Sequence, residues 1–156
     1  MQISELVLNS NINKAVFSKI SKPALFILLG ILTSFIPKIS YAQFSSVSQA
    51  KEFCIKALKN NNVDDLIKAF SDPVEITLPQ EENSYSKTQG AMVIKRFFKN
   101  NAIKSFTVKQ GGKSTGGSEF VIGDMISTSG KKFQVYFLIT LTNQKAYLHL
   151  IEFEET

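Results

Sequence analysis

The sequence predicts an α+β domain in which helices pack on one face of an antiparallel sheet. Before residue 101, three segments repeat apolar residues at helical spacing, with one short strand between them, and after it apolar and polar residues alternate as in strands. Short connections join these later strands, and short connections favour antiparallel pairing because parallel strands need a long crossover. Helices gathered toward one end of the chain and strands toward the other are typical of the α+β class.

The first 42 residues are predicted to be a cleavable export signal. Lys14, Lys19 and Lys22 precede an apolar run from Ala24 to about Ile36, and the small residues of Ser40-Tyr41-Ala42 follow. This order of basic, apolar and small segments is that of a secretory signal. The alternative is a membrane anchor, but the run is shorter than the roughly 20 residues that span a bilayer. We therefore expect residues 43–156 to be periplasmic or secreted, without a stable membrane span.

The remaining 114 residues are enough for one domain that folds without covalent cross-links. Four lysines and one glutamate leave with the signal, so the net charge falls from +5 to +2. This weak charge, together with export, argues against a nucleic-acid partner. Cys54 is the only cysteine, which excludes an intrachain disulfide, and its place on the apolar face of a predicted helix favours a buried thiol.

Capping residues mark the three expected helices. The first begins near Ser46, where Gln49 completes the spacing of a capping box, and it ends at Asn60 to Asn62. Asn62 caps the second helix, which carries apolar residues as far as Phe70 and stops at Asp72-Pro73. A second capping box, Ser86 with Gln89, opens the third helix, and Asn100-Asn101 ends it.

Five strands are expected from alternating apolar and polar residues. The clearest is 132–141, where every odd-numbered position from Phe133 to Leu141 is apolar. A polar turn is expected at 79–84 and a glycine-rich loop at 111–118. The other strands are expected at 74–78, 105–110, 119–127 and 147–153.

Three short motifs resemble a known family. They are Tyr85-Ser86-Lys87-Thr88-Gln89, Phe97-Phe98-Lys99-Asn100 and Phe120-Val121-Ile122-Gly123. Together with the order of the elements they are similar to the family of domain of unknown function 4783. That resemblance implies an exported bacterial domain with a nuclear transport factor 2-like fold, in which a curved antiparallel sheet wraps around helices into a cone. It implies no catalytic residues, because the family has no assigned activity.

His149, the only histidine, is the first candidate for a functional residue. We expect it to share an inward face of its strand with Tyr147, Ile151 and Phe153, and so to line a cavity. In enzymes with this fold, a His, Asp or Tyr in the cavity typically moves protons, and histidine suits this because its pKa lies near neutrality. Asp124 could orient His149. Tyr85 or Tyr136 could donate to a substrate oxygen.

Other motifs are better explained without special chemistry. Gly112-Lys113-Ser114-Thr115 resembles the end of a phosphate-binding loop, but Thr107 stands where that motif needs glycine and a strand follows instead of a helix. The basic cluster of Lys95, Arg96 and Lys99 fits a solvated helix face. One histidine, one cysteine and scattered carboxylates lack the spacing of metal ligands, so we expect no metal and no cofactor.

Three hypotheses of function remain. The first is an exported, non-catalytic binding module that holds a small apolar ligand or a protein partner in a sheet–helix cavity, with Tyr147, His149 and Asp124 as polar anchors. The second is a cofactor-free isomerase or hydrolyase that uses His149 and Asp124. The third is a structural domain of envelope assembly. By analogy with the fold, a homodimer formed through the outer sheet face is also expected.

Overall fold

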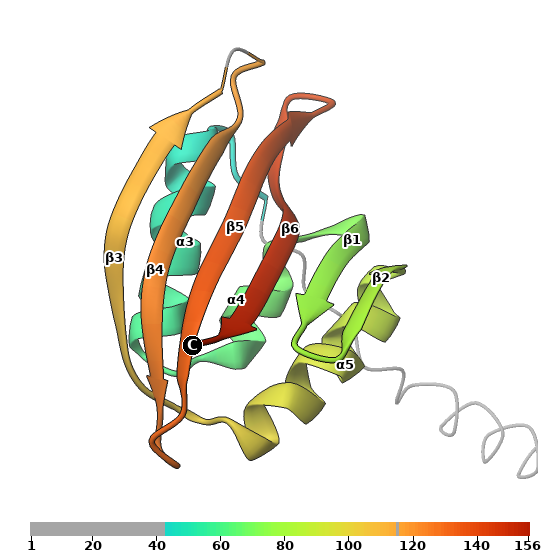
Figure 1. Ribbon diagram of the computed structural model, residues 1–156. Helices are drawn as coiled ribbons and strands as arrows, with labels where there is room; N and C mark the ends of the chain where they lie inside the picture. The colour runs from blue at the N-terminus through green and yellow to red at the C-terminus, as the bar shows by residue number, and fades with distance from the viewer. Residues whose placement is uncertain (1–42, 115) are drawn as a thin grey trace, which may run out of the picture. The chain divides into compact units, whose positions relative to one another are not determined.

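The structure is a computed structural model, and it describes residues 43–114 and 116–156 (Figure 1). The predicted export signal, residues 1–42, lies outside the described residues. The helices are α3 (Val47–Lys59), α4 (Val63–Lys68) and α5 (Lys87–Asn100). The strands are β1 (Phe70–Leu78), β2 (Glu81–Tyr85), β3 (Ile103–Lys113), β4 (Glu119–Ser127), β5 (Lys132–Thr142) and β6 (Lys145–Glu155).

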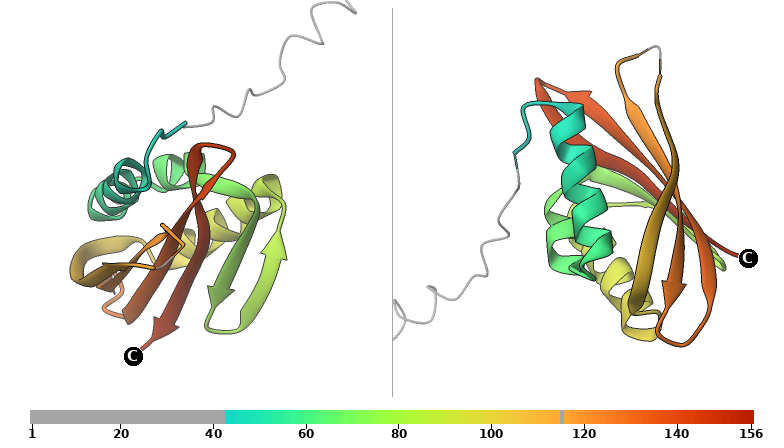
Figure 2. Two further views of the ribbon diagram at one scale, coloured as in Figure 1. Left: turned by 90° about the horizontal axis from the view of Figure 1, so that it is seen from above. Right: turned by 90° about the vertical axis from the view of Figure 1, so that its left-hand side faces the viewer.

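The six strands form one curved sheet in the order β2-β1-β6-β5-β4-β3, with the helices on one face (Figure 2). This confirms the α+β class. Strands β3 to β6 are joined as an antiparallel meander, and β1 pairs with β2 in an antiparallel hairpin. The expectation of a purely antiparallel sheet is wrong at one pair, because β1 runs parallel to β6. The chain between these two strands, which includes α5 and the four strands β2 to β5, is the long crossover that parallel pairing requires.

The predicted caps begin the helices. Ser46 accepts a hydrogen bond from the backbone N–H of Gln49 at the start of α3. Asn62 accepts from the N–H of Asp65 in the same way for α4, which ends at Lys68 because Phe70 already belongs to β1. At α5 both bonds of the capping box between Ser86 and Gln89 are present, so two free backbone donors are satisfied at once.

The largest differences from the expected strand boundaries are in β1, β2 and β3. β1 begins at Phe70, so that Asp72 and Pro73 lie inside a strand. β2 occupies most of the segment that was expected to be a polar turn, and most of its residues are exposed at the edge of the sheet. β3 extends to Lys113, so the first part of the expected glycine-rich loop is strand. An exposed edge strand lacks the alternation of a half-buried one, which is why polarity suggested a turn at β2.

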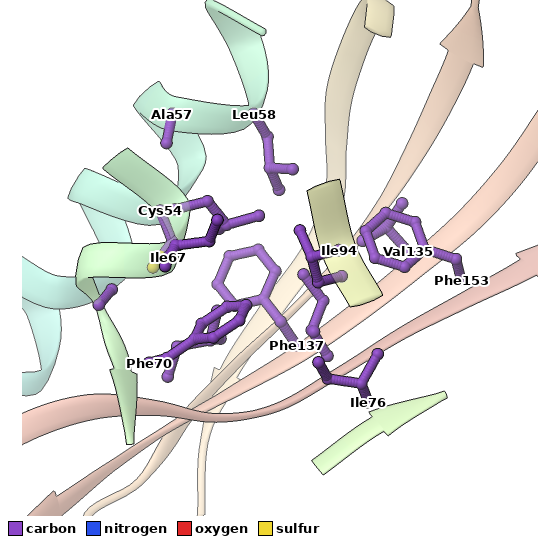
Figure 3. Close-up of a cluster of buried hydrophobic side chains, with 14 of the residues drawn as sticks. Cys54, Ala57, Leu58, Ile67, Phe70, Ile76, Ile94, Val135, Phe137 and Phe153 are labelled. Atoms are coloured by element: carbon purple, nitrogen blue, oxygen red, sulfur yellow. The ribbon is translucent and has the colours of Figure 1, made fainter. Parts of the chain in front are cut away.

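Large apolar side chains fill the space between the helices and the centre of the sheet (Figure 3). Phe97 of α5 lies with its ring centroid 4.8 Å from that of Phe153 and 5.4 Å from that of Phe133. Ile94 and Phe137 are fully buried. Cys54 is also fully buried, as predicted, and burial raises the pKa of its thiol. Spaces that a ligand could enter therefore lie at the margins of this core.

Candidate functional site

A β-bulge in β6 decides where His149 lies. Leu150 is opposite Leu138 of β5, but Leu148 is already opposite Ile139, so His149 is an extra residue in the strand. Leu148 and Ile151 are both fully buried, whereas His149 is partly exposed. The prediction that His149 shares an inward face with Ile151 and Phe153 is therefore wrong. The bulge reverses the alternation between these residues and turns Tyr147 and His149 away from the core.

The neighbouring strand is also irregular at this level. Phe70 of β1 is opposite Leu148 of β6, and Glu75 is opposite Leu150. The four residues of β1 between Phe70 and Glu75 therefore face a single residue of β6, His149, and form an irregularity in the pairing. A pocket of about 400 Å³ opens here, which we call the notch. Its walls are Phe70–Pro73 of β1, Lys87 at the start of α5, Thr142–Asn143 after β5, and Tyr147 and His149 of β6.

The Lys87 side chain forms part of the notch wall although the residue is only 2% exposed. Its ammonium group donates to the carbonyl oxygens of Lys68, 2.9 Å away, and Phe70, 3.0 Å away. Its backbone N–H donates to Oδ1 of Asp72 over 3.2 Å. Desolvation lowers the pKa of Lys87 to about 8, while the charge of Asp72 acts in the opposite direction. One residue thus connects the end of α4, the start of β1 and the start of α5.

The hydroxyl group of Ser71 and the imidazole of His149 complete the polar part of the notch. The hydroxyl of Ser71 can donate to either of two carbonyl oxygens. That of Pro73 lies 2.5 Å from Oγ, and that of Leu148 lies 3.3 Å from it. Nε2 of His149 lies 3.8 Å from Oε1 of Glu75, which does not line the notch, and the His149 side chain is 39% exposed. The notch therefore combines the apolar surfaces of Phe70, Pro73 and Tyr147 with a few polar atoms, an arrangement that suits binding.

Asp124 does not join this group. It lies on β4 opposite Gln134 of β5, and its carboxylate forms an ion pair with Lys109 at 3.1 Å. β5 separates β4 from β6, and the bulge at His149 is opposite Leu138, four residues further along β5. Four residues of a strand span about 13 Å. The structure thus separates Asp124 from His149 and does not form the pair expected for proton transfer.

The two tyrosines considered as proton donors also lie elsewhere. The hydroxyl of Tyr85 donates to Oε1 of Glu81, and this bond is the main cause of a raised pKa of Tyr85. Tyr136 stacks on Phe120 at a centroid distance of 6.0 Å on the outer sheet face. Neither residue lines the notch.

Residues 43–114 and 116–156 contain neither a candidate metal site nor a candidate membrane span. No group of three or more His, Cys, Asp or Glu side chains in these ranges is placed to hold a metal ion. Within the same ranges, no helix is both long enough and apolar enough to cross a membrane.

Comparison with known proteins assigns the family. Residues 51–154 match the model of the family described as domain of unknown function (DUF4783). The chain belongs to this family. The match covers two thirds of the sequence and includes α5 and every strand, so the family assignment that the three motifs suggested is confirmed. No curated protein matches the chain.

Solved structures place this DUF4783 domain in a wider group of folds. A DUF4783 family protein from Bacteroides uniformis is 28% identical, with a TM-score of 0.62, covering 67% of this chain and 95% of that one. One from Bacteroides ovatus is 25% identical, with a TM-score of 0.61 and coverage of 67% and 93%. An NTF2-like protein of unknown function from Cytophaga hutchinsonii is 12% identical, with a TM-score of 0.53 and coverage of 71% and 90%. This last similarity shows the nuclear transport factor 2-like fold.

Proposed function

We propose that this DUF4783 protein is an exported, non-catalytic binding module that holds a small, largely apolar ligand in the notch. The observation that carries the proposal is the convergence of Tyr147, His149 and the buried Lys87 on one pocket of about 400 Å³. Ligand pockets of proteins have volumes of about 300–1,000 Å³ and combine apolar walls with a few polar groups. A strongly perturbed pKa within a pocket also favours a functional site.

The charges around the notch favour an uncharged ligand. The Lys87 ammonium is held by two carbonyl oxygens and lies near Asp72, and His149 faces Glu75. A charged ligand would have to compete with these partners. A ligand with an apolar body and one hydroxyl or carbonyl group could instead hydrogen-bond to Tyr147 or His149. An apolar side chain of a protein partner could occupy the same space.

We do not extend the proposal to an isomerase or hydrolyase. That hypothesis needs Asp124 to orient His149, and the sheet register separates the two residues. Asp124 is therefore not one of the proposed ligand anchors. Lys87, which does line the notch, is added to Tyr147 and His149. A purely structural role in envelope assembly predicts that the notch binds no small molecule, so one experiment distinguishes it from the binding module.

The experiment uses p-cresol and indole as uncharged probes, because each has an apolar ring and one hydrogen-bonding group. Each probe is titrated into the isotope-labelled full chain and followed by amide NMR signals. We expect saturable changes at Asn143, Tyr147 and His149. His149→Ala should weaken binding about tenfold, which corresponds to the loss of one hydrogen bond and its packing.

Asp124→Ala is the matched control, because it removes the other predicted anchor from a half-exposed position outside the notch. It should leave the affinity of both probes unchanged. The proposal fails if neither probe perturbs the notch, which would favour the structural hypothesis. It also fails if His149→Ala binds as well as the unaltered chain.

The export part of the proposal rests on the basic, apolar and small-residue order of the first 42 residues. Expression in a Gram-negative bacterium should give a periplasmic or secreted protein whose N-terminal sequence begins at Gln43. Recovery of the uncleaved chain in the membrane fraction would support the anchor alternative and contradict export as a free protein.

A further inference from the structure

Phe44 attaches the chain in front of α3 to the rest of the domain. Its carbonyl oxygen accepts a hydrogen bond of 2.9 Å from the backbone N–H of Ala146, in an isolated antiparallel bridge to β6. Its ring centroid lies 4.9 Å from that of Phe53 on α3. Phe44 is therefore held by a strand and by a helix, and Gln43 is the residue that precedes this attachment.

The bridge also decides where Gln43 lies. Ala146 is paired with β5 on its other side, so the bridge is on the edge of β6 that β1 occupies further along. In antiparallel pairing, the residue before Phe44 lies at the level of the residue after Ala146, which is Tyr147. Tyr147 is part of the wall of the notch. Gln43 therefore lies beside the notch.

Gln43 is exposed and belongs to no helix or strand. No side chain of residues 43–114 or 116–156 forms a hydrogen bond or an ion pair with that of Gln43. Its amide group can therefore turn back toward the backbone nitrogen of the same residue. The expected signal cleavage follows Ala42, and it would convert this nitrogen into an α-amino group.

An N-terminal glutamine contains both a nucleophile and the group that it attacks. The ordinary pKa of an α-amino group is about 7.7–8.0, so part of the population is neutral and nucleophilic near pH 7. The nitrogen bonds to Cδ of its own side chain and closes a five-membered ring. The side-chain nitrogen leaves with the proton that the amine gives up, as ammonia. The step is intramolecular, which favours it, and it needs no co-reactant.

From this placement we infer that Gln43 of the cleaved chain is a modification site, which closes to pyroglutamate and sets an uncharged ring at the rim of the notch. The inference rests on the proposed export, because only cleavage after Ala42 creates the reacting amine. Closure removes the terminal positive charge beside Tyr147 and leaves one N–H donor and one carbonyl acceptor. An uncharged rim suits the uncharged ligand proposed for the notch.

Intact mass spectrometry tests the closure. The full chain is expressed in a Gram-negative bacterium, and the exported protein is purified, kept at neutral pH and sampled over several days. We expect the mass of residues 43–156 to fall by the mass of one ammonia. Fragmentation of the N-terminal peptide should place this loss on Gln43, which separates it from a loss at any asparagine.

Gln43→Asn is the matched control. It keeps the amide group, but its side chain is one methylene shorter, so closure onto the α-amino group would need a strained four-membered ring. The variant should keep its ammonia at residue 43. A chain that begins at Gln43 and does not lose ammonia would overturn the inference and leave the proposed export in place. A chain that is not cleaved after Ala42 would overturn both.

The position beside the notch has a test of its own. The ring N–H of pyroglutamate gives an amide NMR signal that an α-amino group does not give. When p-cresol is titrated into the cyclised protein, this signal should shift together with that of Tyr147. A shift at Tyr147 without one at the ring N–H would overturn the placement of residue 43, while the proposed ligand binding in the notch would stand.

Discussion

At the scale of single residues, Lys87 contributes through its position at a junction. Its ammonium group accounts for two carbonyl groups, one at the last residue of α4 and one at the first residue of β1. Such carbonyl groups cost free energy when they are buried without a donor. The same group is costly to bury while charged, which is why its pKa falls to about 8. Stability should therefore depend on pH through this residue.

We expect the contribution of Lys87 to rise with pH between about 8 and 10.5. Its ordinary pKa is 10.5 and the folded value is about 8, so in this window the unfolded chain binds the proton and the folded chain releases it. Stability increases with pH wherever the unfolded state binds more protons. The free energy of unfolding by urea, relative to that of Lys87→Met, should rise by roughly 2–3 kcal/mol from pH 7 to pH 10.

Lys99→Met is the matched control, because Lys99 lies on the same helix and is exposed. Its difference from the unaltered chain should stay nearly constant over the same range. A difference for Lys87→Met that is flat or falls with pH would contradict the assigned environment of the amine.

Among the elements, those with a strong local signal were predictable. The capping pairs at Ser46 and Ser86 placed the starts of α3 and α5, and alternation placed β5, where Phe133 and Ile139 are buried. Leu141 ends the same pattern but is 53% exposed, because it lies at the strand end beside the turn. Capping pairs and alternation are patterns among residues that are close in the sequence. They therefore predict where a helix starts and which side of a strand is buried.

The site depended on features that alternation and residue type do not reveal. A bulge adds one residue without a turn signal, so the strand period placed His149 on the wrong face. Lysine is seldom buried, so residue type gave no reason to place Lys87 in a pocket wall. The carboxylate of Asp124 suits the chemistry of a histidine partner, but its strand, β4, is separated from β6 by β5. The positions of His149, Lys87 and Asp124 depend on contacts between segments that are distant in the sequence.

Gly90 lies where α5 packs closely on β1. A Cβ atom at this position would lie 2.7 Å from Cγ1 of Val74 and 3.1 Å from Cδ1 of Ile76, and both side chains are buried. Alanine favours a helix by about 1 kcal/mol over glycine. Overpacking costs about 1–3 kcal/mol. We expect Gly90→Ala to lower the free energy of unfolding by about 1 kcal/mol in urea denaturation.

Thr88→Ala on the exposed side of the same helix provides the comparison, since it gains helix propensity without a new contact. It should leave stability unchanged or raise it slightly. If Gly90→Ala were as stable as Thr88→Ala, the glycine would be a tolerated residue and not a requirement of the packing between α5 and β1.

For the molecule as a whole, the outer face of the sheet carries an apolar band. Ile122 is opposite Tyr136, and Phe120 and Leu150 are both opposite Leu138. All five side chains are partly exposed. Within the described residues, the helices lie on the other face of the sheet (Figure 2). Apolar patches of this kind mark interaction surfaces. We expect this band to form an isologous homodimer interface.

Sedimentation velocity checks this expectation. The unaltered chain should sediment as a dimer at micromolar concentration, and Tyr136→Lys should shift it to a monomer because the new charge would be buried in the interface. Met92→Lys changes an exposed apolar residue of α5, 61% exposed, and should remain a dimer. A monomer at high concentration for the unaltered chain would exclude the interface.

The position of β6 in the sheet affects when the sheet can form during synthesis. β6, the last of the described strands, lies in the interior of the sheet, between β1 and β5. Until it arrives, the β1–β2 hairpin and the β3–β5 meander are two separate sheets without a shared edge. Formation of the native sheet must therefore wait until β6 has been synthesised and can pair with β1 and β5. Chains that end before Lys145 lack the strand that joins the two halves.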